Sequence, residues 1–275
     1  MPKKHFALVV LIVLLFADVA SAEHRRFHLL KALNNGQDTT RPLARFDFRY
    51  QYKLLRKKLS KNTFIFRTDR PIPLNEAWEI NTRLDIPCVL TNKNTQWTPA
   101  KEYRFGLGDV LAEALLTEKI GHEWGAAAGS RFIFPTATGE TLGSGKYQLL
   151  PTVAVGRKLP GISDGSFFTL TTRYAFDYAG SHKRRSISTL EFGPSFNWMM
   201  PRHWFVTTYP STDIQINLRD HGNFFLPFNA MIGKTIPNKA VFSVEFGFPM
   251  YYSGDSSDFY TFYDFKVEAR IGIFY

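Results

Sequence analysis

The chain has 275 residues, of which 44% are hydrophobic and 16% aromatic, and 34 lysines and arginines against 24 aspartates and glutamates give it a formal charge of +10. No apolar run beyond the N-terminal region reaches the about 20 residues that a membrane-spanning helix needs, which excludes a helical membrane protein. The single cysteine excludes an intramolecular disulfide.

Residues 1–22 have the features of a secretory signal peptide. Two lysines precede an apolar run over residues 6–16, and the small residues Ala20 and Ala22 mark a cleavage site. The run is too short to span a bilayer, which disfavours the alternative of an uncleaved anchor. Because the chain is exported, its basic charge favours outer-membrane lipid and lipopolysaccharide as partners over nucleic acid.

The remaining sequence is predicted to form an all-β transmembrane antiparallel barrel over residues 43–275, preceded by a polar periplasmic segment at 23–42. A chain without membrane helices crosses lipid only as a closed barrel. Alternation of polar and apolar residues predicts about twelve strands, an even number as in bacterial barrels. The expected strands are 44–54, 62–68, 77–90, 103–116, 120–134, 146–158, 167–178, 187–199, 203–216, 224–236, 240–252 and 260–275.

The first strand shows the alternation most clearly. Phe46, Phe48 and Tyr50 share one face, and the charged residues between them share the other. The second expected strand is the weakest, because Pro71 and Pro73 cannot donate to a strand ladder and should end it early.

The last expected strand alternates in the same way and ends on Tyr275. A terminal aromatic strand resembles the assembly signal of bacterial outer-membrane barrels, so we expect Tyr275 to serve as that signal and the barrel assembly machinery to be a partner. Charged residues on one face of a closing strand indicate a wet interior.

The charged residues on the predicted inner faces are the candidate functional residues. They carry both signs, and buried charges are tolerated only when paired or hydrated. The set comprises Arg45, Asp47, Arg49, Lys53, Glu79, Arg83, Asp85, Arg173, Asp177, Glu191, Glu245, Lys266, Glu268 and Arg270.

Connection lengths predict which end of the barrel faces outward. Outer-membrane barrels have short periplasmic turns and longer outer loops, and the short expected turns 117–119, 200–202 and 237–239 all fall at one end. Two basic clusters then lie in outer loops, where they are expected to bind lipopolysaccharide phosphates. These residues are Arg56, Lys57, Lys58 and Lys61 in the first loop and Lys183, Arg184 and Arg185 in the fourth.

The sequence supplies no complete catalytic or metal motif. His122 and Glu123 begin like a zinc-protease helix, but Ala126 stands where the second histidine is required. None of the seven histidines has a serine two positions later, as an outer-membrane phospholipase would have. We therefore expect no enzyme activity, no metal and no cofactor.

Two motifs in the middle of the chain resemble a known family. Gly106, Gly108 and Asp109 form a Gly-x-Gly-Asp strand, and residues 134–146 contain a Pro-Thr and Gly-x-Gly loop. These motifs are similar to those of the outer-membrane barrels named for the meta-pathway of phenol degradation (MetA-like). The resemblance implies a barrel grouped with transporters of small, often aromatic or hydrophobic compounds, and it implies no catalytic residues.

The sequence thus predicts a porin-like passive channel in the outer membrane of a Gram-negative bacterium, with an unidentified small-molecule solute. If the inner charges pair completely and plug the lumen, the alternative is a structural or surface-interaction barrel without transport.

Overall fold

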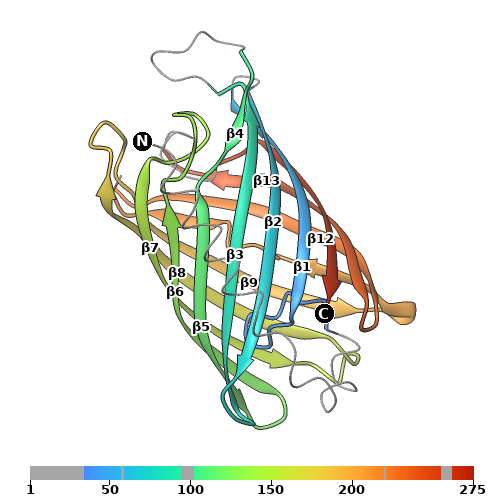
Figure 1. Ribbon diagram of the computed structural model, residues 1–275. Helices are drawn as coiled ribbons and strands as arrows, with labels where there is room; N and C mark the ends of the chain where they lie inside the picture. Colours follow the sequence, from blue (N-terminus) through green and yellow to red (C-terminus); the bar gives the residue numbers. More distant parts are fainter. Residues whose placement is uncertain (1–33, 57–58, 94–101, 220, 255–261) are drawn as a thin grey trace.

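The computed structural model describes residues 34–56, 59–93, 102–219, 221–254 and 262–275. Within them, one antiparallel sheet closes on itself into a barrel (Figure 1). Its strands are β1 (Arg45–Leu55), β2 (Leu59–Pro73), β3 (Trp78–Thr91), β4 (Arg104–Leu107), β5 (Val110–Ile120), β6 (Trp124–Phe134), β7 (Lys146–Lys158), β8 (Phe167–Gly180), β9 (Ser188–Met199), β10 (Trp204–Thr208), β11 (Ile214–Asn217), β12 (Asn223–Ile236), β13 (Ala240–Tyr252) and β14 (Phe265–Phe274). No helix in these ranges is long and apolar enough to cross a membrane.

The fourteen strand segments build a barrel of twelve strands. Segments β4 and β5 both pair with β3, so they form one broken strand. Segments β10 and β11 both pair with β9 and β12, so they form a second broken strand. The predicted fold class and strand number are confirmed.

The barrel closes between its first and last strands. Arg45 lies opposite Phe274 and Leu54 opposite Phe265 in an uninterrupted antiparallel register. Phe46 and Phe48 remain about half exposed on the outside, at 49% and 48%. Apolar side chains that stay exposed along a closed barrel form the surface that faces lipid.

The prediction that prolines end the second strand early is wrong. Strand β2 continues through Pro71 and Pro73, which lie opposite Asn81 and Glu79 of β3. The pairing of β2 with β1 has already ended at Asp69. Proline is tolerated there because β2 has a neighbouring strand on one side only, so a missing N–H need not break a ladder bond.

Two other boundaries differ from expectation. The turn expected at 117–119 lies at 121–123, because β5 stays paired with β6 as far as Ile120 opposite Trp124. Gly121 adopts a positive φ of 61°, which suits glycine best. Strand β14 begins at Phe265, and Phe262 and Tyr263 before it turn into the barrel and pack on Phe225.

The short connections 121–123, 200–203 and 237–239 lie at the end of the barrel that carries Tyr275, here called the C-terminal end. The connections between β6 and β7 and between β8 and β9 lie at the opposite end (Figure 1). This layout matches the predicted one, in which the C-terminal end is periplasmic.

The described part of the N-terminal segment, residues 34–42, lies inside the barrel wall at the C-terminal end and contains no helix. Asn35 and Thr40 are fully buried. The Asn35 side chain donates to Asn197 Oδ1 of β9 at 2.8 Å. The segment is therefore packed against the barrel rather than separate from it.

Candidate functional site

The candidate site is the barrel interior. Because side chains alternate along each strand, one set points into the barrel. All fourteen charged residues that were expected to face inward are buried or half-buried. Nine are buried, namely Arg45, Asp47, Asp85, Arg173, Glu191, Glu245, Lys266, Glu268 and Arg270. Arg49, Lys53, Glu79, Arg83 and Asp177 are half-buried.

The seam between β1 and β14 brings inward-facing charges of the first and last strands together. Arg49 Nε donates to Glu268 Oε1 at 2.7 Å, and Gln51 donates to Oε2 of the same carboxylate at 2.8 Å. Arg45 Nε lies 3.3 Å from Asp47. The polar side chains of the first and last strands therefore bind one another inside the closed barrel.

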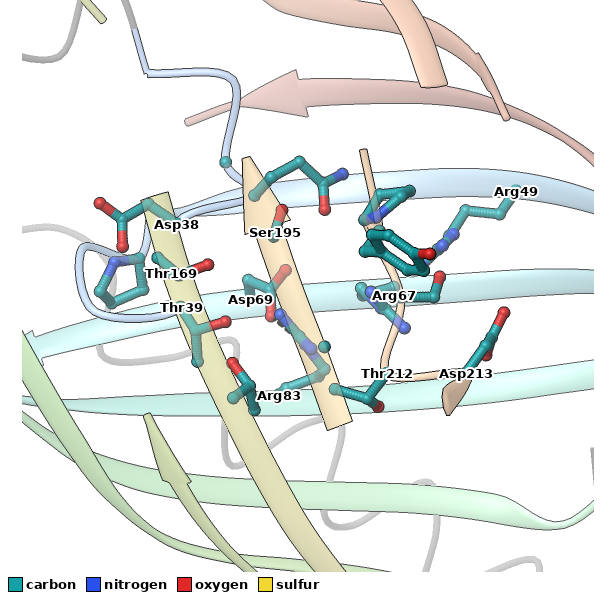
Figure 2. Close-up of a pocket in the computed structure, with 18 of the residues that line it drawn as sticks. Asp38, Thr39, Arg49, Arg67, Asp69, Arg83, Thr169, Ser195, Thr212 and Asp213 are labelled. Atoms are coloured by element: carbon teal, nitrogen blue, oxygen red, sulfur yellow. Dashed lines mark hydrogen bonds and ion pairs between the residues drawn. The ribbon is translucent and has the colours of Figure 1, made fainter. Parts of the chain in front are cut away.

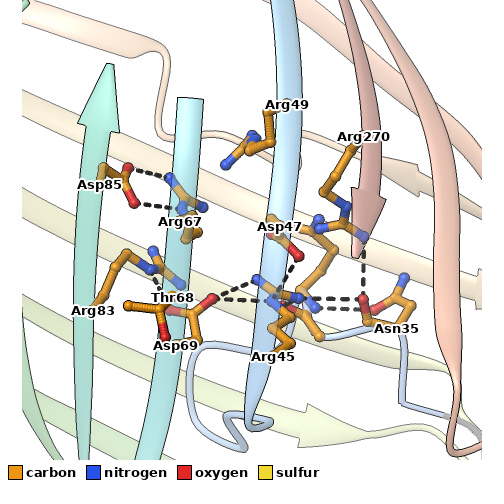
Figure 3. A network of polar contacts seen from close by, with 12 residues as sticks. Asn35, Arg45, Asp47, Arg49, Arg67, Thr68, Asp69, Arg83, Asp85 and Arg270 are labelled. Atoms are coloured by element: carbon orange, nitrogen blue, oxygen red, sulfur yellow. Dashed lines mark hydrogen bonds and ion pairs between the residues drawn. The ribbon is translucent and has the colours of Figure 1, made fainter. Parts of the chain in front are cut away.

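A network of arginines and carboxylates joins β1, β2 and β3 (Figure 3). Asp69 of β2 binds Arg45 at 2.9 Å and Arg83 at 2.5 Å. Arg67 holds Asp85 through two hydrogen bonds of 2.7 and 2.6 Å, the paired geometry that suits a guanidinium and a carboxylate.

Glu113 of β5 is shared by three arginines. Its carboxylate lies 2.8 Å from Arg131, 3.3 Å from Arg83 and 3.6 Å from Arg173. Glu113 thus connects β3, β6 and β8 within the network.

A second cluster surrounds Lys266 of β14. Its ammonium group contacts Glu245 at 2.5 Å and Asp213 at 2.6 Å. Asn229 also donates to Asp213, at 2.8 Å. Asp213 belongs to residues 209–213, the break between β10 and β11, which turns into the lumen.

Residues 209–213 are fixed by contacts with the wall on both sides of them. Tyr209 has a positive φ of 47°, which turns the chain away from strand geometry. Arg173 of β8 donates to the Thr212 hydroxyl, and Asp213 accepts from Lys266. These contacts hold the segment across the barrel interior.

The N-terminal segment narrows the C-terminal end of the lumen. Arg45 donates to the carbonyl of Gly36 at 2.6 Å, and Arg41 donates to the carbonyl of Glu123 at 2.6 Å. Thr40 packs directly on Gly156 of β7, where an added Cβ would lie 2.6 Å from the Thr40 hydroxyl oxygen.

Between these two inward segments lies a cavity of about 210 Å³. Figure 2 shows Arg67, Asp69 and Arg83 in it, with Asp38 on one side and Thr212 on the other. Seven basic side chains line the cavity, against four acidic ones. The basic ones are Arg45, Arg49, Arg67, Arg83, Arg131, Arg173 and Lys266, and the acidic ones are Asp38, Asp69, Asp213 and Glu268.

Sequence reasoning missed Arg67, Asp69, Glu113, Arg131 and Asp213. The first four stand at inward positions of β2, β5 and β6, so strict alternation along those strands would have found them. Asp213 lies outside a strand and has no such pattern.

The remaining expected site residues lie near the ends of the barrel. Glu79 lies 3.7 Å from Lys119 at the C-terminal end. Asp177 pairs with Lys146 at 2.9 Å, close to the opposite end. The half-buried Lys53 extends over the ring of Tyr263, 5.3 Å from its centroid.

Tyr275 lies against the barrel wall at the seam. Its ring stacks on Phe46 with a centroid distance of 4.5 Å, and its hydroxyl donates to the carbonyl of Asp69 at 3.3 Å. The role of Tyr275 as an assembly signal stays a prediction.

The two expected lipopolysaccharide-binding clusters lie at the same end of the barrel, with one correction. Lys61 belongs to β2, on the inward-facing set, and not to a loop, because β2 begins at Leu59. Lys57 and Lys58 lie outside the described residues. Arg56 stacks over the Tyr252 ring at 4.7 Å.

The second cluster lies in the connection between β8 and β9. Lys183 and Arg185 are exposed, whereas Arg184 is half-buried and donates to the carbonyl of Glu140. Lipopolysaccharide binding by either cluster stays a prediction.

No protein-family model and no curated protein matches the sequence. Solved structures do match it. An outer-membrane channel from Pseudomonas putida F1 aligns with a TM-score of 0.64 at 12% identity, over 86% of this chain and 97% of that one. The NanC porin aligns with a TM-score of 0.51 at 12% identity, over 84% and 98% of the two chains.

Outer-membrane phospholipase A from Escherichia coli also aligns, at 10% identity over 88% of this chain and 97% of that one, but its TM-score of 0.47 is too low to bear on activity. At these identities the likeness concerns the fold. The chain has the fold of the bacterial outer-membrane β-barrel channels.

Proposed function

We propose that the protein is a narrow passive channel for small polar solutes in the bacterial outer membrane. The observation that carries the proposal is the cavity of about 210 Å³ inside a closed barrel, lined mainly by charged and hydroxyl side chains. Charged groups in contact with such a space keep it hydrated, because removing their water without full pairing is costly. A hydrated lumen is what a solute needs to cross the barrel.

The size of the cavity limits the solute. Small-molecule pockets usually measure about 300 to 1,000 Å³, and the space between the N-terminal segment and residues 209–213 is smaller. A channel of this kind passes small solutes and retains large ones.

The motif resemblance to the meta-pathway barrels is compatible with a transport role. Its implied aromatic or hydrophobic solutes fit the lining less well, since the cavity presents seven basic and four acidic side chains. We therefore favour a polar solute.

A structural or surface-interaction barrel without transport is the second candidate. It is favoured by the pairing of interior charges, as in Arg67 with Asp85 and Arg49 with Glu268. Complete pairing and the two inward segments would then close the lumen.

Swelling of proteoliposomes separates the two candidates. Refolded protein should make liposomes swell in glycine or succinate faster than protein-free liposomes do, and swelling in a large oligosaccharide should stay at background. Swelling at background for every solute would contradict the channel and favour the structural barrel.

A further inference from the structure

Several arginines of the lumen are more exposed than the carboxylates that bind them. In the two pairs with Asp69 and Glu113, the carboxylate side chains are 3% and 1% exposed, whereas Arg83 and Arg131 retain 17% and 15%. Arg67 lines the cavity and its partner Asp85 does not. A solute in this space can therefore contact the guanidinium groups of Arg67, Arg83 and Arg131 directly.

Two donors in the cavity wall have no hydrogen-bond partner among the described residues. These are Arg173 Nε and Ser195 Oγ. Both residues line the cavity, and both are only 6% exposed. A buried donor without a partner costs free energy, which a ligand acceptor would recover.

The carboxylates nearest to Arg173 do not line the cavity. Glu113 is shared with Arg83 and Arg131, and Glu191, opposite Arg173 in the ladder, does not line the cavity. The Arg173 guanidinium group, rather than these carboxylates, thus faces the open space.

From these observations we propose that the lumen contains a binding site for small oxyanions, formed by Arg67, Arg83, Arg131, Arg173 and Ser195. Guanidinium groups present paired donors that match carboxylate and phosphate oxygens. The volume of about 210 Å³ restricts the ligand to a small organic acid or inorganic phosphate. This proposal deepens the proposed function, since it names the solute class of the channel.

Equilibrium binding to the refolded full chain in detergent tests the site. Succinate and inorganic phosphate are the probes, and glucose is the neutral control. We expect succinate or phosphate to bind with a salt-dependent affinity and glucose not to bind. The tighter of the two anions identifies carboxylate or phosphate as the source of the oxygens.

The matched variants are the double substitutions R67Q/D85N and R157Q/E123Q. Each removes one Arg–carboxylate pair without changing net charge, but Arg157 and Glu123 form an exposed pair at the barrel rim, 48% and 38% exposed. The first should weaken binding about tenfold, the effect of losing one charge-assisted contact, and the second should not change it.

S195A is a second, milder variant, for which we expect a loss of a few fold with normal heat-modifiable folding. The absence of anion binding by the wild type, or equal binding by wild type, R67Q/D85N and S195A, would overturn the site. Anion binding without solute flux would support the site and contradict the channel. Solute flux without anion binding would contradict the site and support the channel.

Discussion

At the scale of single residues, Asp69 joins two parts of the inner wall. It is 2% exposed and binds Arg45 of β1 and Arg83 of β3. A buried ion pair stabilises a fold little more than well-packed apolar side chains would, because both charges lose their hydration when they are buried. Removing one partner is costly, because it leaves the other charge buried without compensation.

We expect D69N to lower the free energy of unfolding by about 3 kcal/mol, since two buried guanidinium groups lose their shared carboxylate. Urea unfolding of the protein in lipid vesicles measures this change. The control is E123Q at the exposed pair with Arg157, where screening by solvent limits the loss to less than about 1 kcal/mol. Equal losses of unfolding free energy for both variants would show that the Asp69 network stabilises the protein no more than an exposed ion pair does.

At the scale of elements, the strands whose two faces differ in polarity could be predicted from the sequence. The alternation of polar and apolar residues predicted the positions of β1, β13 and β14. It also predicted that Arg49 and Glu268 face inward. The inward course of residues 209–213 was not predicted, although Pro210 and Ser211 are typical of a break. Contacts from distant strands fix that segment, and alternation along one strand contains no information about them.

The seam between β1 and β14 makes Tyr275 a test of assembly. Deleting Tyr275 removes the ring that stacks on Phe46, so we expect less heat-modifiable folded protein on refolding. Y275F keeps the ring and should assemble like the wild type. Y147A removes a tyrosine of the same exposure, 37%, away from the seam and should also assemble normally. A normal folded yield after deletion of Tyr275 would contradict the assembly-signal hypothesis.

At the scale of the whole molecule, a closed wall surrounds an interior divided by two inward segments. The sequence predicts the wall and its wet inner face, because both follow from a period of two. It does not predict that residues 34–42 enter the barrel, since their buried contacts, such as Asn35 with Asn197, join residues far apart in the chain. The shape of the interior space is therefore a property of the assembled barrel.

Single-channel conductance of the refolded protein tests the proposed solute path most directly, with T171W and T172W as a matched pair. Thr171 lines the cavity, and Thr172 is the next residue of β8, on the outward face. We predict conductance above background for the wild type, a lower conductance for T171W and a wild-type value for T172W. No conductance from the wild type, or an equal effect of the two substitutions, would contradict a solute path through the lumen.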